Sequence, residues 1–161
     1  MLKKSFAVLF TLVMILSTIS FVQAGQKGKH KSKELKLGVD VVLSSEKDAL
    51  KGKRVGLITN PTGVDKDLNS IVDRFYQDKD INLTALYGPE HGVRGDAQAG
   101  SYVDFYIDET TGLPVYSLYG KTRKPTPEML EDVDVLVFDI QDVGTRFYTY
   151  IYTMALAMEA A

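Results

Sequence analysis

The sequence predicts an α/β protein built on a mostly parallel sheet, and two observations support this. A short apolar run ends in a polar, glycine-containing loop three times, within residues 54–63, 81–95 and 134–146, and a helical pattern usually follows. The third run, Asp134–Ile140, resembles a strand that a parallel sheet buries on both faces. Right-handed crossovers between such strands give a Rossmann-like sheet with flanking helices, where ligands bind beyond the carboxyl ends of the strands.

The first elements of this domain are a helical turn and a strand. Residues 44–50 predict a helical turn with Ser44 or Ser45 as its N-cap, because a serine hydroxyl accepts a hydrogen bond from a free amide of the first turn. The compact apolar run 54–59 predicts a buried strand, and a turn containing Asn60 and Pro61 ends it.

The remaining elements follow from apolar spacing, β-rich composition and capping residues. They are a helix at 67–76, a strand at 81–87, two β-rich arms at 102–107 and 115–119, a short helix that begins at Thr126 and Pro127, a strand at 134–140 and a helix from about Phe147. We interpret the two arms and their turn-rich connection as an inserted flap beside the second loop. Their exposed tyrosines either stack on sugar rings or pack the flap, and packing is favoured.

The amino terminus predicts an exported protein. A basic start, an apolar stretch at 6–22 and small residues before the Ala24–Gly25 junction indicate a secretory signal peptide at 1–24, with a membrane anchor as the alternative. Residues 25–36 predict a basic disordered leader, and after cleavage we expect a secreted protein with no stable membrane anchor.

The catalytic domain expected at residues 37–161 is acidic and free of cysteine. It carries 12 Lys and Arg against 20 Asp and Glu, a formal charge of −8, which excludes a nucleic-acid-binding protein. With no cysteine there is no disulfide framework, so an apolar core must stabilise it. The helical pattern at 150–161 carries no capping signal, from which we expect the front part of a larger protein, with the fold incomplete at its C-terminus and a C-terminal domain absent.

The loops exclude several chemistries. They contain no dinucleotide fingerprint and no phosphate-binding loop, and none presents a serine in a nucleophile elbow. His91 is the only histidine of residues 37–161, which disfavours zinc. We therefore expect neither a metal nor another cofactor, and carboxylate chemistry remains.

The loop Gly88-Pro89-Glu90-His91-Gly92-Val93-Arg94 is the main candidate for that chemistry, although turn residues alone predict an ordinary turn equally well. A partly desolvated Glu90 carboxyl can donate a proton to a leaving oxygen. Asp139 or Asp142 can supply the second carboxylate that sugar hydrolysis usually needs, or can instead cap and tie a loop. Arg94 and Arg146 can bind a substrate carboxylate or can neutralise acids within the fold. Asn60 completes the residues expected to converge on one rim of the sheet.

Three motifs in order resemble the NamZ-type exo-β-N-acetylmuramidases. They are Leu57-Ile58-Thr59-Asn60-Pro61-Thr62-Gly63, the loop from Gly88 to Arg94, and Phe138-Asp139-Ile140-Gln141-Asp142-Val143-Gly144-Thr145-Arg146-Phe147-Tyr148-Thr149-Tyr150. The resemblance implies a Rossmann-like N-terminal domain, a smaller C-terminal domain, and an active cleft between them. It also implies Glu90 as the catalytic glutamate. From the loops themselves we take His91 and Asp139 as further catalytic candidates and Asn60, Arg94, Asp142 and Arg146 as substrate-binding ones.

The activity that the resemblance implies is exo-acting glycoside hydrolysis. The expected reaction releases N-acetylmuramic acid from the non-reducing end of peptidoglycan fragments, in cell-wall turnover and recycling, without metal or nucleotide. The partners expected are saccharides that contain muramic acid. Two alternatives remain open: an exported module that binds cell-wall glycans without cleaving them, and an esterase or amidase, which the missing nucleophile disfavours.

Overall fold

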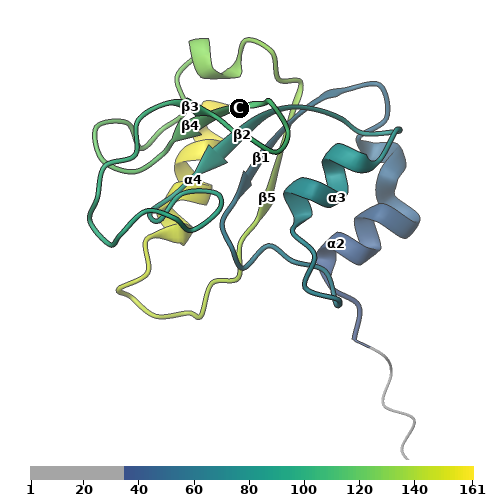
Figure 1. The fold of residues 1–161 in the computed structure, drawn as a ribbon, viewed down its shortest axis with the longest axis horizontal. Coiled ribbons are helices and arrows are strands. Elements are labelled where there is room, and N and C mark those ends of the chain that lie inside the picture. Colours follow the sequence, from purple (N-terminus) through teal and green to yellow (C-terminus); the bar gives the residue numbers. More distant parts are fainter. Residues whose placement is uncertain (1–34) are drawn as a thin grey trace, which may run out of the picture. The chain divides into compact units, whose positions relative to one another are not determined.

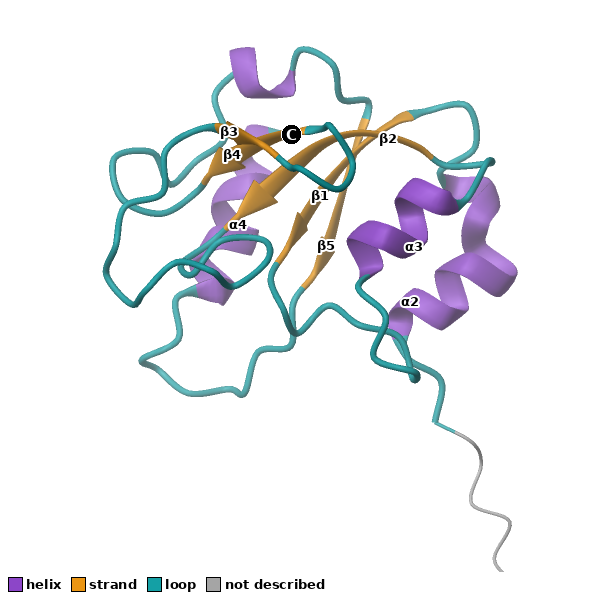
Figure 2. Ribbon diagram, viewed as in Figure 1, coloured by secondary structure: helices purple, strands orange, loops and turns teal. Residues whose placement is uncertain are grey.

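The structure, a computed structural model, describes residues 35–161, and their core is a five-stranded sheet (Figures 1 and 2). Its strands are β1 (Arg54–Thr59), β2 (Asn82–Gly88), β3 (Tyr106–Ile107), β4 (Pro114–Ser117) and β5 (Val135–Asp139). The strand order is β3-β4-β2-β1-β5; β3 pairs antiparallel with β4, and the other pairs are parallel. The predicted Rossmann-like, mostly parallel α/β fold is therefore confirmed. The predicted signal peptide lies outside the described residues, as does the predicted leader up to residue 34.

Helices cover both faces of the sheet. The helical segment formed by α2 (Gly38–Val41), the π-helical turn η1 (Val42–Glu46) and the 3-10 turn η2 (Lys47–Ala49) lies on one face with α3 (Ile71–Gln77). Helix α4 (Tyr150–Ala160) lies on the other face, and the 3-10 turn η3 (Glu128–Leu130) precedes β5 (Figure 1). We refer to the two sides as the α3 face and the α4 face.

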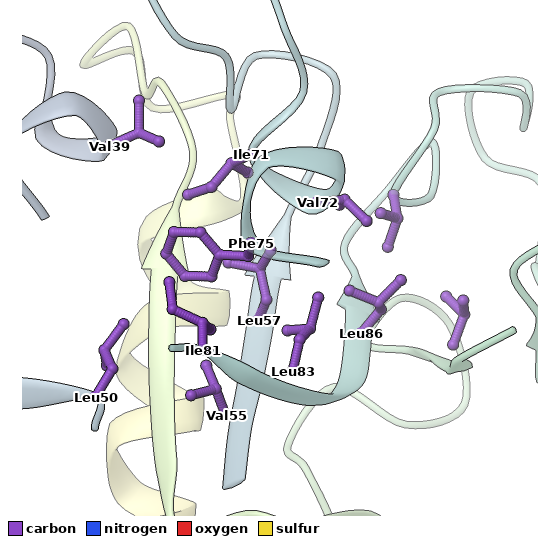
Figure 3. Packing of buried hydrophobic residues seen from close by; sticks show 12 residues of the cluster. Val39, Leu50, Val55, Leu57, Ile71, Val72, Phe75, Ile81, Leu83 and Leu86 are labelled. Atoms are coloured by element: carbon purple, nitrogen blue, oxygen red, sulfur yellow. The ribbon is translucent and has the colours of Figure 1, made fainter. Parts of the chain in front are cut away.

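The α3 face holds the larger core (Figure 3). Alternate strand residues such as Val55 and Leu57 pack there against Ile71, Val72 and Phe75 of α3, and all five are essentially inaccessible to solvent. Because side chains alternate across a strand, the neighbouring strand residues must face the other side.

The α4 face holds a smaller core. Ile58, Ala85 and Tyr87 of the strands pack there with Leu118 and Ala157. Tyr87 is fully buried, its phenol donates a hydrogen bond to the Met129 carbonyl, and burial raises the pKa of that phenol. The phenol thus stays a donor, as a buried hydroxyl must.

The first two helix starts differ from the prediction. The first helical segment begins at Gly38, so Ser44 and Ser45 lie inside it and bond back to carbonyls of the preceding turn instead of capping it. The second helix begins at Ile71 with Ser70 as N-cap, whose hydroxyl accepts from the Val72 amide at 3.2 Å. Leu68, which matched the helical spacing, lies in a turn with positive φ and is 79 % exposed.

The predicted flap was wrong. Strand β4 pairs in parallel with β2 through Leu86–Val115, Tyr87–Tyr116 and Gly88–Ser117, so it belongs to the main sheet. Tyr116 stacks on Tyr87 with ring centroids 5.5 Å apart, which confirms packing for that tyrosine. The sequence pattern marked the strand correctly but did not reveal its partner.

The α4 face is less completely covered than the α3 face. Each residue of β5 is only half-buried, although its apolar pattern predicts burial on both sides. Helix α4 is apolar around its circumference and leaves Ile151, Tyr152 and Met158 exposed. Among the described residues, no helix has the length and apolar character needed to cross a bilayer.

Candidate active site at the carboxyl ends of the strands

The loops after β1 and β5 are hydrogen-bonded to each other. The Thr59 hydroxyl donates to the Asp139 carbonyl at 2.8 Å, and the Thr62 hydroxyl accepts from the Gln141 amide at 2.8 Å. Gly63 lies so close to Thr59 and the Asp139 carbonyl that any side chain there would overlap them. A glycine is therefore required where these two loops cross.

The loop after β2 joins the same rim. A side chain at Gly95 would overlap the ring of Pro61, so the second loop touches the first. The three loops, far apart in the sequence, thus form one continuous rim at the carboxyl ends of β1, β2 and β5 (Figure 1). This is the convergence that parallel pairing predicts.

Glu90 lies on this rim, half-buried, two residues beyond the end of β2. Its Oε1 accepts a hydrogen bond from the Gly100 amide at 3.1 Å. The phenol of Tyr119 lies close enough to the same carboxylate for Glu90 to raise the pKa of Tyr119. The carboxyl is thus held by the Gly100 amide and lies beside a phenol from a different segment.

His91 shapes the loop that carries Glu90. It has a positive φ of 74°, which is unusual for a residue with a side chain, and its Nδ1 lies 3.1 Å from the Ala97 carbonyl oxygen. The Ala97 amide returns a hydrogen bond to the His91 carbonyl at 3.3 Å. In this geometry His91 closes its own loop, so its role as a catalytic residue stays a prediction.

Asp139 and Asp142 contribute carboxylates at the end of β5. Burial raises the pKa of Asp139, and its Oδ2 is buried without a hydrogen-bond partner among residues 35–161. Asp142 Oδ1 accepts from the Gly144 amide at 2.6 Å, which ties its loop, while its Oδ2 is likewise unpartnered in that range. Asp139 is the more chemically distinctive of the two, because desolvation favours its protonated form.

Asn60 is buried, and its amide oxygen accepts from both the amide and the hydroxyl of Thr62, at 3.0 and 2.6 Å. It therefore forms the turn after β1. Arg146 is exposed in the loop before α4, and no ion pair engages it in the described part of the chain.

Arg94 differs from the substrate-binding expectation. Its guanidinium donates to both oxygens of Asp108 at 3.0 Å and pairs with Asp73 of α3 at 2.9 Å. Val93, the residue before it, is buried in the core of the α3 face. The side chain thus neutralises two acids within the fold, the alternative that the sequence left open.

Two residues of the rim were not predicted as site residues: the sequence left Tyr119 as a tyrosine that either stacks on sugar or packs, with packing favoured, and it did not single out Arg123. Tyr119 follows β4 as Glu90 follows β2, and Arg123 lies close enough to Tyr119 to oppose the effect of Glu90 on its pKa. The β-rich run 114–117 was the signal that could have placed these two residues. Assigning that run to the main sheet would have located Tyr119 and Arg123 on the rim. No group of three or more His, Cys, Asp or Glu residues suited to a metal ion occurs in the described range.

Comparison with known proteins identifies the family. The family described as "Exo-beta-N-acetylmuramidase NamZ, N-terminal" matches residues 55–161. The chain belongs to this family. A curated NamZ relative, the peptidoglycan beta-N-acetylmuramidase NamZ of Bacillus subtilis strain 168, is 60 % identical over 163 residues, covering 99 % of this chain and 39 % of that protein. The chain thus spans about two-fifths of the length of this curated relative.

Two solved structures share the fold. Both are crystal structures of DUF1343 family proteins from Bacteroides fragilis NCTC 9343, and each match covers 78 % of this chain and 31 % of the other. One has a TM-score of 0.71 at 62 % identity, and the other 0.61 at 34 % identity. NamZ membership and these likenesses agree with the fold described above.

Proposed function

We propose that the protein is an exo-acting glycoside hydrolase that releases N-acetylmuramic acid from the non-reducing end of peptidoglycan fragments. The observation that carries this proposal is the fixed Glu90 carboxylate on a rim that also bears Asp139, in a chain that belongs to the NamZ family. The 60 % identity to a protein named as a peptidoglycan β-N-acetylmuramidase supports the choice of substrate.

Two carboxyls on one rim provide the pair that glycoside hydrolysis usually needs. Glu90 accepts a hydrogen bond from the Gly100 amide and lies near the Tyr119 phenol, whereas Asp139 is desolvated with one oxygen unpartnered in the described range. We propose Glu90 as the group that acts directly on the glycosidic bond, as general acid, and Asp139 as the candidate second carboxyl. His91, Asn60 and Asp142 are proposed to shape the loops that present them.

The test is turnover of a β-linked N-acetylmuramic acid–N-acetylglucosamine disaccharide by the protein expressed from its complete reading frame. Free N-acetylmuramic acid, identified by mass spectrometry, is the expected product. Glu90→Gln is expected to lower kcat by about 10²-fold or more, because it removes the proton donor and keeps the side-chain shape. Glu46→Gln, an exposed site on the helical segment before β1, is the matched control with full activity expected.

Wild-type turnover by Glu90→Gln on this unactivated disaccharide would falsify the assignment of Glu90. Saturable binding of the disaccharide with no product from the wild-type protein would instead indicate a binding module. We also propose export, on the basis of the signal-like residues 1–24, and N-terminal sequencing of protein recovered from the culture medium tests it.

A further inference from the structure

A pocket beside Glu90 has the composition of a sugar-binding site. It encloses about 370 Å³ between the segment after β4 and the first turns of α4, within the usual size range for small ligands. Its lining combines two tyrosines, two threonines, one arginine and three apolar residues: Tyr119, Tyr152, Thr149, Thr153, Arg123, Leu118, Ala155 and Leu156.

The backbone fixes the wall of this pocket that adjoins Glu90. Gly88 of β2 pairs with Ser117 of β4, and the Leu118 amide donates to the Gly88 carbonyl at 2.8 Å. Glu90 and Tyr119 therefore stand two residues beyond the ends of adjacent parallel strands. The Ser117 hydroxyl accepts from the Tyr119 amide at 3.3 Å and donates to its carbonyl at 3.1 Å, which holds Tyr119 in place.

The opposite wall offers an aromatic surface. Tyr152 of α4 lines the pocket and is 66 % exposed, so its ring is free to stack on an apolar face of a sugar. The Thr149 and Thr153 side chains add hydroxyl groups at the same end of α4. A pyranose ring bound here would lie near the Glu90 carboxylate, because Tyr119 lines the pocket and lies close enough to that carboxylate for Glu90 to raise its pKa.

Arg123 is the cation of this pocket. The segment after Tyr119 carries three cations, and two have partners: Lys121 lies over the Tyr102 ring at 5.1 Å, and Lys124 pairs with Glu159 at 3.2 Å. Arg123 is exposed, and no carboxylate of residues 35–161 pairs with it. In a domain with a formal charge of −8, Arg123 is thus a cation that no carboxylate of residues 35–161 occupies, and it is free to bind an anion at this pocket.

We propose that this pocket binds the muramic acid ring and that Arg123 binds its lactyl carboxylate. The inference rests on the proposed function and deepens it by naming the group that distinguishes muramic acid from glucosamine, which lacks the lactyl ether. Guanidinium is suited to this task because its planar fork binds both oxygens of a carboxylate. Arg94 is already occupied by Asp108 and Asp73, so it is not the specificity residue.

Two measurements on the protein expressed from its complete reading frame test the proposal. The first is the affinity for free N-acetylmuramic acid and for N-acetylglucosamine, by calorimetry. The second is KM and kcat for 4-nitrophenyl β-glycosides of the same two sugars. Arg123→Gln is expected to weaken binding of the muramic sugar and raise its KM by about 10- to 100-fold, the usual range for a hydrogen bond to a charged group, with kcat nearly unchanged. Values for the glucosamine sugar are expected to stay the same, and Arg123→Lys is expected to restore part of the loss.

Lys121→Gln is the matched control, since it removes a neighbouring cation that lies over a tyrosine ring. Unchanged affinity for N-acetylmuramic acid in Arg123→Gln overturns the inference whether or not the enzyme turns over. An equal loss for both sugars also overturns it, because that outcome indicates a general effect on the pocket. Binding that depends on Arg123, without hydrolysis by the wild type, would support the pocket and overturn the hydrolase.

Discussion

The two faces of the sheet differ in how completely their side chains are covered. On the α3 face, Phe75 and Val72 are fully buried, and Arg94 closes the margin through its ion pairs with Asp73 and Asp108. The α4 face has a smaller core, a half-buried edge strand and exposed apolar residues on its helix. The closed face stabilises the fold, whereas the open one carries Tyr119, Arg123 and the pocket. Arg94 on the α3 face therefore stabilises the fold, whereas Arg123 on the α4 face is left for a ligand, although both arginines lie near one rim.

The largest effect is expected from a pair of side-chain truncations, one on each face of the sheet. Phe75→Ala is expected to lower the free energy of unfolding by about 3–5 kcal/mol, because it leaves a cavity in a close-packed core. Met158→Ala, at a site 72 % exposed on α4, is expected to change it by less than about 0.5 kcal/mol. Urea unfolding followed by circular dichroism measures both. Similar costs at the two sites would show that α4 is covered in solution, and the comparison would fail.

The next test concerns the ion pairs of Arg94. Arg94→Ala leaves the Asp108 carboxylate, only 5 % exposed, without its cation, and we expect a loss of about 2–3 kcal/mol. This is below the figure for a fully buried pair, because Arg94 keeps about a quarter of its surface exposed. Arg123→Ala, on the open face, is the control and is expected to leave stability unchanged.

The same variant has a pH signature. Hydrogen bonds from Arg94 hold the pKa of Asp108 below its usual range, so the stability they supply is present above the unfolded pKa of about 3.9 and is lost as pH falls through the folded value. Acid unfolding of Arg94→Ala is therefore expected at a higher pH than that of the wild type. Coincident acid transitions would contradict this account of Arg94.

The smallest effect is expected at Asp139. Burial raises its pKa, so its ionised form at neutral pH opposes folding, and this penalty disappears as pH falls below the unfolded pKa. Asp139→Asn is expected to be as stable as the wild type or slightly more stable at pH 7, with no advantage near pH 3, while turnover falls. Thermal unfolding at the two pH values, with an activity assay, measures it. A stability loss at pH 7 would assign Asp139 a structural role.

The sequence predicted the helices and strands themselves better than it predicted their boundaries and the elements that they contact. Residues 54–59 form the strand expected there, because a compact apolar run bounded by turn residues leaves few alternatives. The predicted helix began too early because the apolar side chain of Leu68 matched the helical spacing. In the structure Leu68 lies in a local turn, and the helix begins after Ser70, which is its N-cap. Local pattern fixes an element, but tertiary contacts decide where it ends.

At the candidate site, too, the sequence pattern did not reveal tertiary contacts. The place of Glu90 and Asp139 on the rim could be predicted because both lie at the carboxyl ends of recognisable strands, and parallel pairing brings such ends together. Arg94 lies four residues from Glu90, yet its partners Asp73 and Asp108 are distant in the sequence, and nothing local revealed them. For Tyr119 the sequence favoured packing over sugar stacking, because its strand was assigned to a flap and not to the main sheet.

The two-residue strand β3 determines where this sheet can be extended. It pairs with β4 through Tyr106 and Ile107 alone, so its outer side offers too short a ladder for another polypeptide to align on. Very short edges of this kind are one way proteins avoid aggregation. Strand β5, at the other margin, pairs with β1 on one side only and runs over five residues. Any strand that joins this sheet, from the same polypeptide or from another molecule, is therefore expected at β5.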